Sequence, residues 1–180
     1  MAAIQEATRA ELAEAGYSGV TYEGVARRAR TSKPVLYRRY PSRAHMVVDA
    51  MPNLHWQADD VVDSQSLRDD LLEVFTKVLN NFRIIGIDNY RQLIADADDT
   101  LLDSLNAQVT ELATKTIYPA LSRARARGEI GPLHIPHRAA TIIGTLLRDE
   151  LFFTRRDIDS TALAEMLDTV YLPLITAISR

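Results

Sequence analysis

Apolar residues recur every three or four positions along nearly the whole chain. Ile4, Ala7 and Leu12 share one face of a helix expected over residues 3–15, and Gly16 follows it as a stop signal. No segment shows sustained alternation of apolar and polar residues between turn signals, which is the pattern of a half-buried strand. The pattern therefore predicts an all-α fold.

Two further short helices are expected within the first 40 residues. Thr21 is a natural N-cap for a helix over residues 22–29, and Thr31 or Ser32 can cap the next, over residues 33–39. Three short helices joined by tight turns form a helix-turn-helix arrangement, in which the last helix enters the major groove of DNA. Residues 33–39 are therefore the predicted recognition helix.

The middle of the chain continues the helical pattern. A fourth helix starts near Ser42, and Pro52 should end or kink it. The Ser66-x-x-Asp69 spacing is that of a capping box and opens another helix, and a short helix follows near residues 89–97. The apolar positions of the capped helix are Leu71, Leu72, Phe75, Val78, Leu79 and Phe82.

The last part of the chain predicts one long helix and two closing ones. The long helix runs over residues 100–127, is expected to kink at Pro119, and ends at Gly128. The closing helices are expected over residues 137–154 and 160–178. Three arginines in the last turn of the long helix are interpreted as a solvated helix end rather than as DNA contacts: Arg123, Arg125 and Arg127.

Composition and charge narrow the class of protein. The 180 residues are 47% hydrophobic and 25% charged and include no cysteine, which excludes disulfides and thiolate metal sites and fits a cytoplasmic globular chain. No apolar run approaches the length of a membrane span, so no membrane association is expected. The formal net charge of −3 is unevenly distributed, because residues 1–45 hold eight Lys or Arg against four Asp or Glu. Residues 27–43 contain seven cations and no acid, which indicates an anionic partner at this end of the chain.

Ten residues at this end are predicted to contact double-stranded DNA. The first turn of the recognition helix should approach base edges, and the starts of the second and fourth helices should bind phosphates. The predicted set is Thr21, Tyr22, Ser32, Lys33, Pro34, Val35, Tyr37, Arg38, Tyr40 and Arg43.

The N-terminal sequence resembles the DNA-binding domain of TetR-type transcriptional regulators. The resemblance lies in Ile4-Gln-Glu-Ala-Thr-Arg-Ala-Glu-Leu-Ala-Glu-Ala-Gly-Tyr and in Ala29-Arg-Thr-Ser-Lys-Pro-Val-Leu-Tyr-Arg-Arg-Tyr-Pro-Ser-Arg-Ala, and it covers about the first 50 residues. It implies a homodimer with a DNA-reading domain at residues 1–45 and a helical-bundle effector and dimerisation domain at residues 46–180. It also implies that a small molecule releases the protein from its operator.

Three positions depart from the pattern of that family. Arg30 stands where the turn before the recognition helix usually has Gly, and a left-handed conformation there would cost Arg30 about 1 kcal/mol. A basic arm of the kind that often precedes the first helix is expected to be absent or truncated before Ile4, and Arg43 replaces the usual Lys. None of these departures removes the resemblance.

Candidates for effector binding and dimerisation come from the C-terminal part. Aromatic and charged residues on the expected bundle helices are candidates for the ligand pocket, although such residues commonly form the core instead: His55, Trp56, Phe75, Phe82, Tyr90, Tyr118 and Arg148. Apolar stripes on the two closing helices are expected to pair across a dimer, with Gly144 allowing close approach, unless they pack within one subunit: Ile143, Leu147, Leu151, Leu163, Leu167, Val170, Leu174 and Ile178.

Other classes of protein fit the sequence less well. No Glu-x-x-His pair of a di-iron bundle, phosphate-binding glycine loop or nucleophile elbow occurs, so neither an enzyme nor a cofactor is expected. His134-x-x-His137 lacks the further ligands of a zinc site. The prediction is a ligand-responsive, DNA-binding transcriptional regulator, with repression favoured over activation. The alternative is a helical small-molecule-binding dimer whose reader no longer binds DNA specifically.

Overall fold

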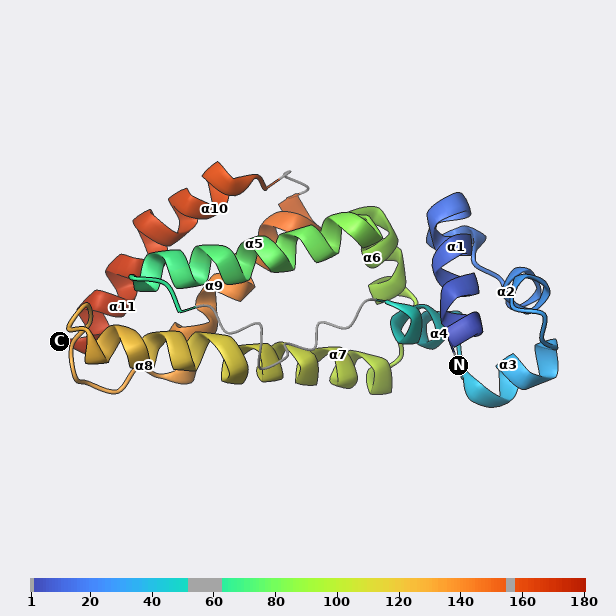
Figure 1. Ribbon diagram of the computed structural model, residues 1–180, viewed down its shortest axis with the longest axis horizontal. Helices are drawn as coiled ribbons and strands as arrows, with labels where there is room; N and C mark the ends of the chain where they lie inside the picture. The colour runs from blue at the N-terminus through green and yellow to red at the C-terminus, as the bar shows by residue number, and fades with distance from the viewer. Residues whose placement is uncertain (1, 52–62, 155–157) are drawn as a thin grey trace. The chain divides into compact units, whose positions relative to one another are not determined.

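The computed structural model describes residues 2–51, 63–154 and 158–180 (Figure 1). Every regular element in these ranges is helical, which confirms the predicted all-α fold. The chain divides into two compact units: Met1–Asn53 with Asn81–Ala107, and Leu54–Asn80 with Gln108–Arg180. Each unit is discontinuous in sequence, and the domain boundary near residue 45 stays a prediction.

The first unit contains the expected run of short helices. Thr21 caps the second of them, since its hydroxyl accepts a hydrogen bond from the Gly24 N–H at 3.0 Å, and Ser42 caps the fourth through the His45 N–H at 3.4 Å. The third has the predicted bounds. The four helices are α1 (Ala2–Gly19), α2 (Tyr22–Arg28), α3 (Lys33–Arg39) and α4 (Arg43–Ala50).

Gly16 interrupts α1 as its position in the sequence predicted. Its φ of +67° lies in the left-handed region that glycine adopts without strain. The chain bends there, and the N–H of Tyr17 donates to the Asn89 side-chain oxygen at 2.8 Å. This bond ties the end of α1 to α6 (Ile87–Ala95).

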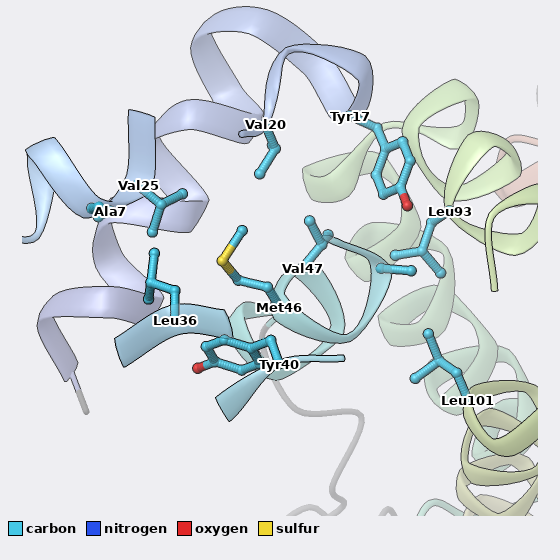
Figure 2. Close-up of a cluster of buried hydrophobic side chains, with 12 residues drawn as sticks. Ala7, Tyr17, Val20, Val25, Leu36, Tyr40, Met46, Val47, Leu93 and Leu101 are labelled. Atoms are coloured by element: carbon cyan, nitrogen blue, oxygen red, sulfur yellow. The ribbon is translucent and has the colours of Figure 1, made fainter. Parts of the chain in front are cut away.

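The core of the first unit draws on residues from beyond the first four helices. α1 packs on α2, α4 and α6, and α4 also contacts α6. Figure 2 shows Leu93 from α6 and Leu101 from α7 (Asp99–Leu112) in the same buried cluster as Leu36 and Val47, with Leu93 fully buried and Leu101 4% exposed. Burying a leucine side chain contributes about 1.5–3 kcal/mol, so these two residues are a substantial part of this core.

The second unit is built on helices from the middle and the end of the chain. α5 opens with the predicted capping interaction, in which the Ser66 hydroxyl accepts from the Asp69 N–H at 3.1 Å. The remaining helices of the second unit end close to the predicted limits. The helices are α5 (Leu67–Ile85), whose last residues belong to the first unit, α8 (Tyr118–Ala126), α9 (His137–Asp149), α10 (Ser160–Met166) and α11 (Leu172–Ser179).

Three π-helical segments continue α7, α9 and α10 where the sequence predicted uninterrupted helices or a kink. They span Ala113–Ile117, Glu150–Thr154 and Leu167–Tyr171. Pro119 and Pro173 occupy the second positions of the helices that follow two of them. A proline has no N–H for the preceding turn, and a wider π turn accommodates that loss.

The arginines at the end of α8 correct the prediction of a solvated helix end. Arg123 donates to Asp70 at 3.0 Å, and Asp70 is fully buried. Arg127 pairs with Glu129 and lies 3.7 Å from the same Asp70 carboxylate, while Arg125 donates to backbone carbonyls of the loop that follows. The sequence did not reveal this network because Asp70 lies more than 50 positions away along the chain.

The C-terminal helical stretch is more apolar than expected from the sequence, where no apolar run approached the length of a membrane span. Ser160–Ser179 meets the length and hydropathy of a membrane span, with a mean hydropathy of 1.3, and it is the one such stretch among the described residues. Core helices of globular proteins meet the same test. About 22% of the stretch is buried in the single chain.

Candidate nucleic-acid interface

The predicted recognition helix α3 presents one polar face to solvent. Its buried contact is Leu36, which is fully buried in the core of the first unit, whereas Lys33, Pro34 and Tyr37 are exposed. Ser32 is the N-cap residue, yet its hydroxyl makes no capping hydrogen bond in the described structure. The hydroxyl is therefore available to a base edge or a phosphate.

An open hollow of about 480 Å³ lies beside this face, within the first unit. It brings together five of the ten predicted DNA contacts from three helices and the turn before α2. Its lining is Val20, Thr21, Tyr22, Glu23, Lys33, Tyr37, Arg43 and Asp96. The two acids, Glu23 and Asp96, had no place in the predicted site.

Tyr22 and Tyr37 form one wall of the hollow. Their rings stack with centroids 4.3 Å apart, and Tyr37 keeps 61% of its surface exposed. The Tyr22 hydroxyl donates to the Tyr40 carbonyl at 2.9 Å, so its proton is already used within the protein. Burial raises the pKa of Tyr22, which keeps the phenol neutral.

Tyr40 was predicted as a hydroxyl donor to DNA, and the structure corrects this. Only 5% of Tyr40 is exposed, and its hydroxyl donates to the Asp49 carboxylate at 2.6 Å while accepting from the Arg39 Nε at 2.9 Å. Its ring belongs to the buried cluster in Figure 2. Tyr40 therefore fixes the end of α3 to α4 and does not face outward.

Arg43 is held by several groups of the first unit. Its Nη2 donates to the Asp96 carboxylate at 3.1 Å, and its guanidinium carbon lies 4.4 Å from the centre of the Tyr17 ring. The Tyr17 hydroxyl donates to the same Asp96 oxygen at 2.7 Å. Hydrogen bonds from Tyr17 and Arg43 lower the pKa of the Asp96 carboxyl, so it is ionised at neutral pH.

The cations of residues 27–43 differ in how far they are paired internally. Arg28 binds Glu11 and Glu14 of α1, and Lys33 lies 3.2 Å from Glu23. Three others have no ion pair among the described residues and are exposed: Arg27, Arg30 and Arg38. Residues 27–43 contain no acid, but some of their cations therefore pair with acids from other segments of the chain.

Arg30 adopts the left-handed conformation that its position in the turn suggested. Its φ is +54°, and it is the one non-glycine residue with positive φ in the described part of the chain. The Thr31 N–H reaches back to the Ala26 carbonyl at 2.9 Å and closes the turn before α3. The strain of this conformation is about 1 kcal/mol.

Comparison with known proteins decides the family. Residues 61–170 match the family described as the tetracyclin repressor-like C-terminal domain, and residues 4–50 match the bacterial regulatory proteins of the tetR family. The chain belongs to the TetR family.

Relatives of this TetR-family chain carry consistent descriptions. It is 28% identical over 169 residues to an uncharacterized HTH-type transcriptional regulator of Mycobacterium tuberculosis, covering 92% of this chain and 82% of that one. It is 25% identical to a DNA-binding transcriptional repressor TetR of Mycobacteroides abscessus, over 89% of this chain and 85% of that one. A Clostridium perfringens protein assigned as a regulator of fatty acid metabolism has the same fold, with a TM-score of 0.54, 18% identity and 96% coverage of both chains. The protein is a DNA-binding transcriptional regulator and not an enzyme.

The predicted effector residues of this TetR-family protein fall into separate groups. Phe82 and Tyr90 meet edge to face at 5.0 Å in the first unit. In the second unit the Tyr118 hydroxyl bonds His137 Nδ1, and Arg148 reaches the Thr145 hydroxyl at 3.5 Å. Phe75 is buried in the second unit, and His55 and Trp56 lie outside the described residues. The effector site stays a prediction.

The predicted dimer residues also divide into two sets. Five are at most 2% exposed in the single chain and so belong to the interior of the second unit: Ile143, Leu147, Leu151, Leu163 and Leu167. This agrees with the alternative interpretation of the apolar stripes, which was packing within one subunit. Val170 is 45% exposed, and Leu174 and Ile178 are half-buried. A Cβ atom placed at Gly144 would lie 4.0 Å from the Phe75 ring of the same chain.

Proposed function

We propose that this TetR-family protein is a cytoplasmic repressor that binds a pseudo-palindromic operator as a homodimer. The observation that carries the proposal is the arrangement around α3, where a buried Leu36 anchors the helix and Ser32, Lys33, Pro34 and Tyr37 project outward. Side chains in the first turn of a recognition helix read base edges, with about 1–3 kcal/mol of discrimination for each well-made contact. Arg38 and Arg43 would bind phosphates on either side of the groove.

Dimerisation is proposed through the exposed face of the C-terminal helices. Val170, Leu174 and Ile178 keep apolar surface open in a stretch that is about 22% buried. A second copy of the chain would remove this surface from water. The two readers would then contact half-sites about 34 Å apart along the DNA, which is one helical turn.

A small-molecule effector is proposed to release the protein from DNA. The description of the matched C-terminal domain supports such a role. The ligand would bind a conformation that is incompatible with the operator and would shift the population towards it. Pro52, which follows α4 in the sequence and lies outside the described residues, is a candidate hinge. Pro52→Ala would test this role through the coupling between ligand and DNA.

Selection of bound sequences from a random pool of double-stranded DNA, at two salt concentrations, tests the proposal. Enrichment of an inverted repeat supports a dimeric, sequence-specific regulator and provides the probe for a ligand-release screen. Salt-sensitive binding without an enriched motif would leave only the general attraction to phosphates. That outcome favours the alternative, a small-molecule-binding dimer whose reader has lost specificity.

A further inference from the structure

The hollow beside α3 has no net charge, although it lies on the most basic part of the chain. Two of its lining residues are cations, Lys33 and Arg43, and two are acids, Glu23 and Asp96. Each cation is paired with one acid, at 3.2 Å for Lys33 with Glu23 and at 3.1 Å for Arg43 with Asp96. A phosphate that approaches this surface therefore meets cations that already have an anionic partner.

The two pairs differ in how firmly they are held. The Lys33 and Glu23 side chains are 51% and 72% exposed, and exposed pairs of this kind are weak and easily exchanged. The Arg43 and Asp96 side chains are 32% and 46% exposed. The Arg43 guanidinium also lies on the Tyr17 ring, and its Nη1 points at the Ser18 carbonyl at 3.4 Å. Arg43 is thus oriented by three groups, of which only Asp96 is charged.

Asp96 reaches Arg43 from outside the helix-turn-helix segment. It is the C-cap residue of α6, and α6 packs on both α1 and α4 within the first unit. Its carboxylate is also held by the Tyr17 hydroxyl, which donates to the same oxygen that accepts from Arg43. Asp96 is therefore a positioned anion at the guanidinium of Arg43, the group expected to bind a DNA phosphate.

We propose that Asp96 acts as an internal competitor of the DNA phosphate for Arg43. A carboxylate and a phosphodiester oxygen accept the same charge-assisted hydrogen bonds from a guanidinium. When DNA binds, the Arg43 Nη2 exchanges the Asp96 oxygen for a phosphate oxygen, and Asp96 keeps the hydrogen bond from Tyr17. The exchange lowers the affinity for all DNA sequences and leaves the choice of sequence to α3. This inference rests on the phosphate-binding role of Arg43 in the proposed function.

The salt dependence of binding distinguishes this competition from a simple phosphate contact. A lysine or arginine that neutralises one phosphate adds about 0.9 to the slope of log affinity against log salt. If Asp96 takes up a cation from solution when Arg43 leaves it, the net contribution of Arg43 to that slope is smaller. Neutralising Asp96 should restore the full contribution.

The test compares Asp96→Asn, Arg43→Gln and the double variant with the parent protein on two duplexes, a selected operator and a random-sequence duplex of equal length. Asp88→Asn is the matched control, because it also removes one negative charge from α6. Asp88 lies in the first turn of that helix, and its side chain is 87% exposed. Asp96→Ser is a second variant, to be used if the Asp96→Asn protein fails to fold. Thermal unfolding and gel filtration of each variant report its fold and oligomeric state.

The proposal expects Asp96→Asn to bind both duplexes roughly two- to fivefold more tightly than Asp88→Asn, with a steeper salt slope. Arg43→Gln should reduce the slope by about 0.9 in the Asp96→Asn background and by less in the parent. Weaker binding by folded Asp96→Asn and Asp96→Ser, with Arg43→Gln also weaker, would overturn the proposal, because Asp96 would then position Arg43 for DNA. Parent-like binding by Arg43→Gln would instead remove the phosphate role of Arg43 from the proposed function.

Discussion

Tyr22 and Tyr37 stack with their ring centroids 4.3 Å apart and their planes inclined by 27°. The contact joins the first turn of α2 to the exposed face of α3, and it leaves Tyr37 61% exposed. The ring braces α3 against α2, and its hydroxyl has a second, proposed task as a donor to DNA. Substitutions at Tyr37 separate these tasks.

Replacing Tyr37 with Phe should weaken operator binding and leave stability unchanged. The phenyl ring keeps the stack, while the lost hydroxyl removes one hydrogen bond, worth about 0.5–1.5 kcal/mol, or roughly two- to tenfold in affinity. Tyr37→Ala should also lower the free energy of unfolding, because it removes an aromatic pair worth about 0.5–1.5 kcal/mol. DNA titration and thermal unfolding measure the two effects. Parent-like DNA binding by Tyr37→Phe would show that the hydroxyl does not contact DNA.

Replacing Arg30 with Gly should stabilise the protein by about 1 kcal/mol, because glycine adopts the observed φ of +54° without strain. Arg30→Ala is the control, since it removes the same charge and keeps the Cβ atom that causes the strain. Urea denaturation of both variants gives the free energies of unfolding. Equal values for the two variants would contradict the strain argument.

Tyr17 should make the protein sensitive to alkali. Burial, followed by the hydrogen bond to Asp96, raises the pKa of Tyr17 to about 12 from an ordinary value of 10.0. The folded state therefore favours the neutral phenol, and this contribution is complete below the unfolded-state pKa near 10 and is lost as the pH rises towards 12. In Tyr17→Phe, stability should start lower at neutral pH and fall less over that range. Denaturation of both proteins at stepwise pH checks this, and parallel curves would show that Tyr17 is not the group responsible.

The buried carboxylate of Asp70 should contribute more to the free energy of unfolding than an exposed carboxylate does. It accepts from the Ser64 N–H at 2.6 Å and from Arg123 at 3.0 Å, and it is fully buried. Asp70→Asn should lower the free energy of unfolding by about 3 kcal/mol, because it removes the buried charge that pairs with Arg123 and leaves that arginine only the exposed Asp63 carboxylate, at 3.3 Å.

The exposed acid Glu73, which pairs with Lys77 one turn away, is the matched control for Asp70. Glu73→Gln should cost at most about 0.5 kcal/mol. Urea denaturation compares the two variants. A similar small loss in both would mean that the Asp70 network contributes little to stability.

Local sequence signals predicted most of the helices because these signals act within a few residues. The cap residues Thr21 and Ser42 and the glycines Gly16 and Gly128 each constrain the adjacent backbone directly. The π-helical segments were not predicted, since a one-residue widening of a turn leaves the apolar pattern almost unchanged.

The candidate site was only partly predictable for a different reason. The exposed face of α3 follows from its position in the helix-turn-helix segment, and Lys33 and Tyr37 are exposed on that helix. The positions of the Tyr40 and Asp96 side chains depend on partners from other elements. Tyr40 binds Asp49, and Asp96 binds Tyr17 and Arg43. No local pattern reports such pairings, so they required the three-dimensional structure.

The burial of Leu93 and Leu101 beside Leu36 and Val47 has a consequence for exchanging readers between regulators. A graft that transfers only the first 50 residues would place a foreign set of side chains against this α6 and α7 surface. Because protein cores tolerate little change in volume, such a chimaera should fold poorly unless its junctions also carry the segment around residues 81–107. New operator specificity in this protein is therefore easier to reach by substitutions on the outer face of α3 than by recombination at the end of α4.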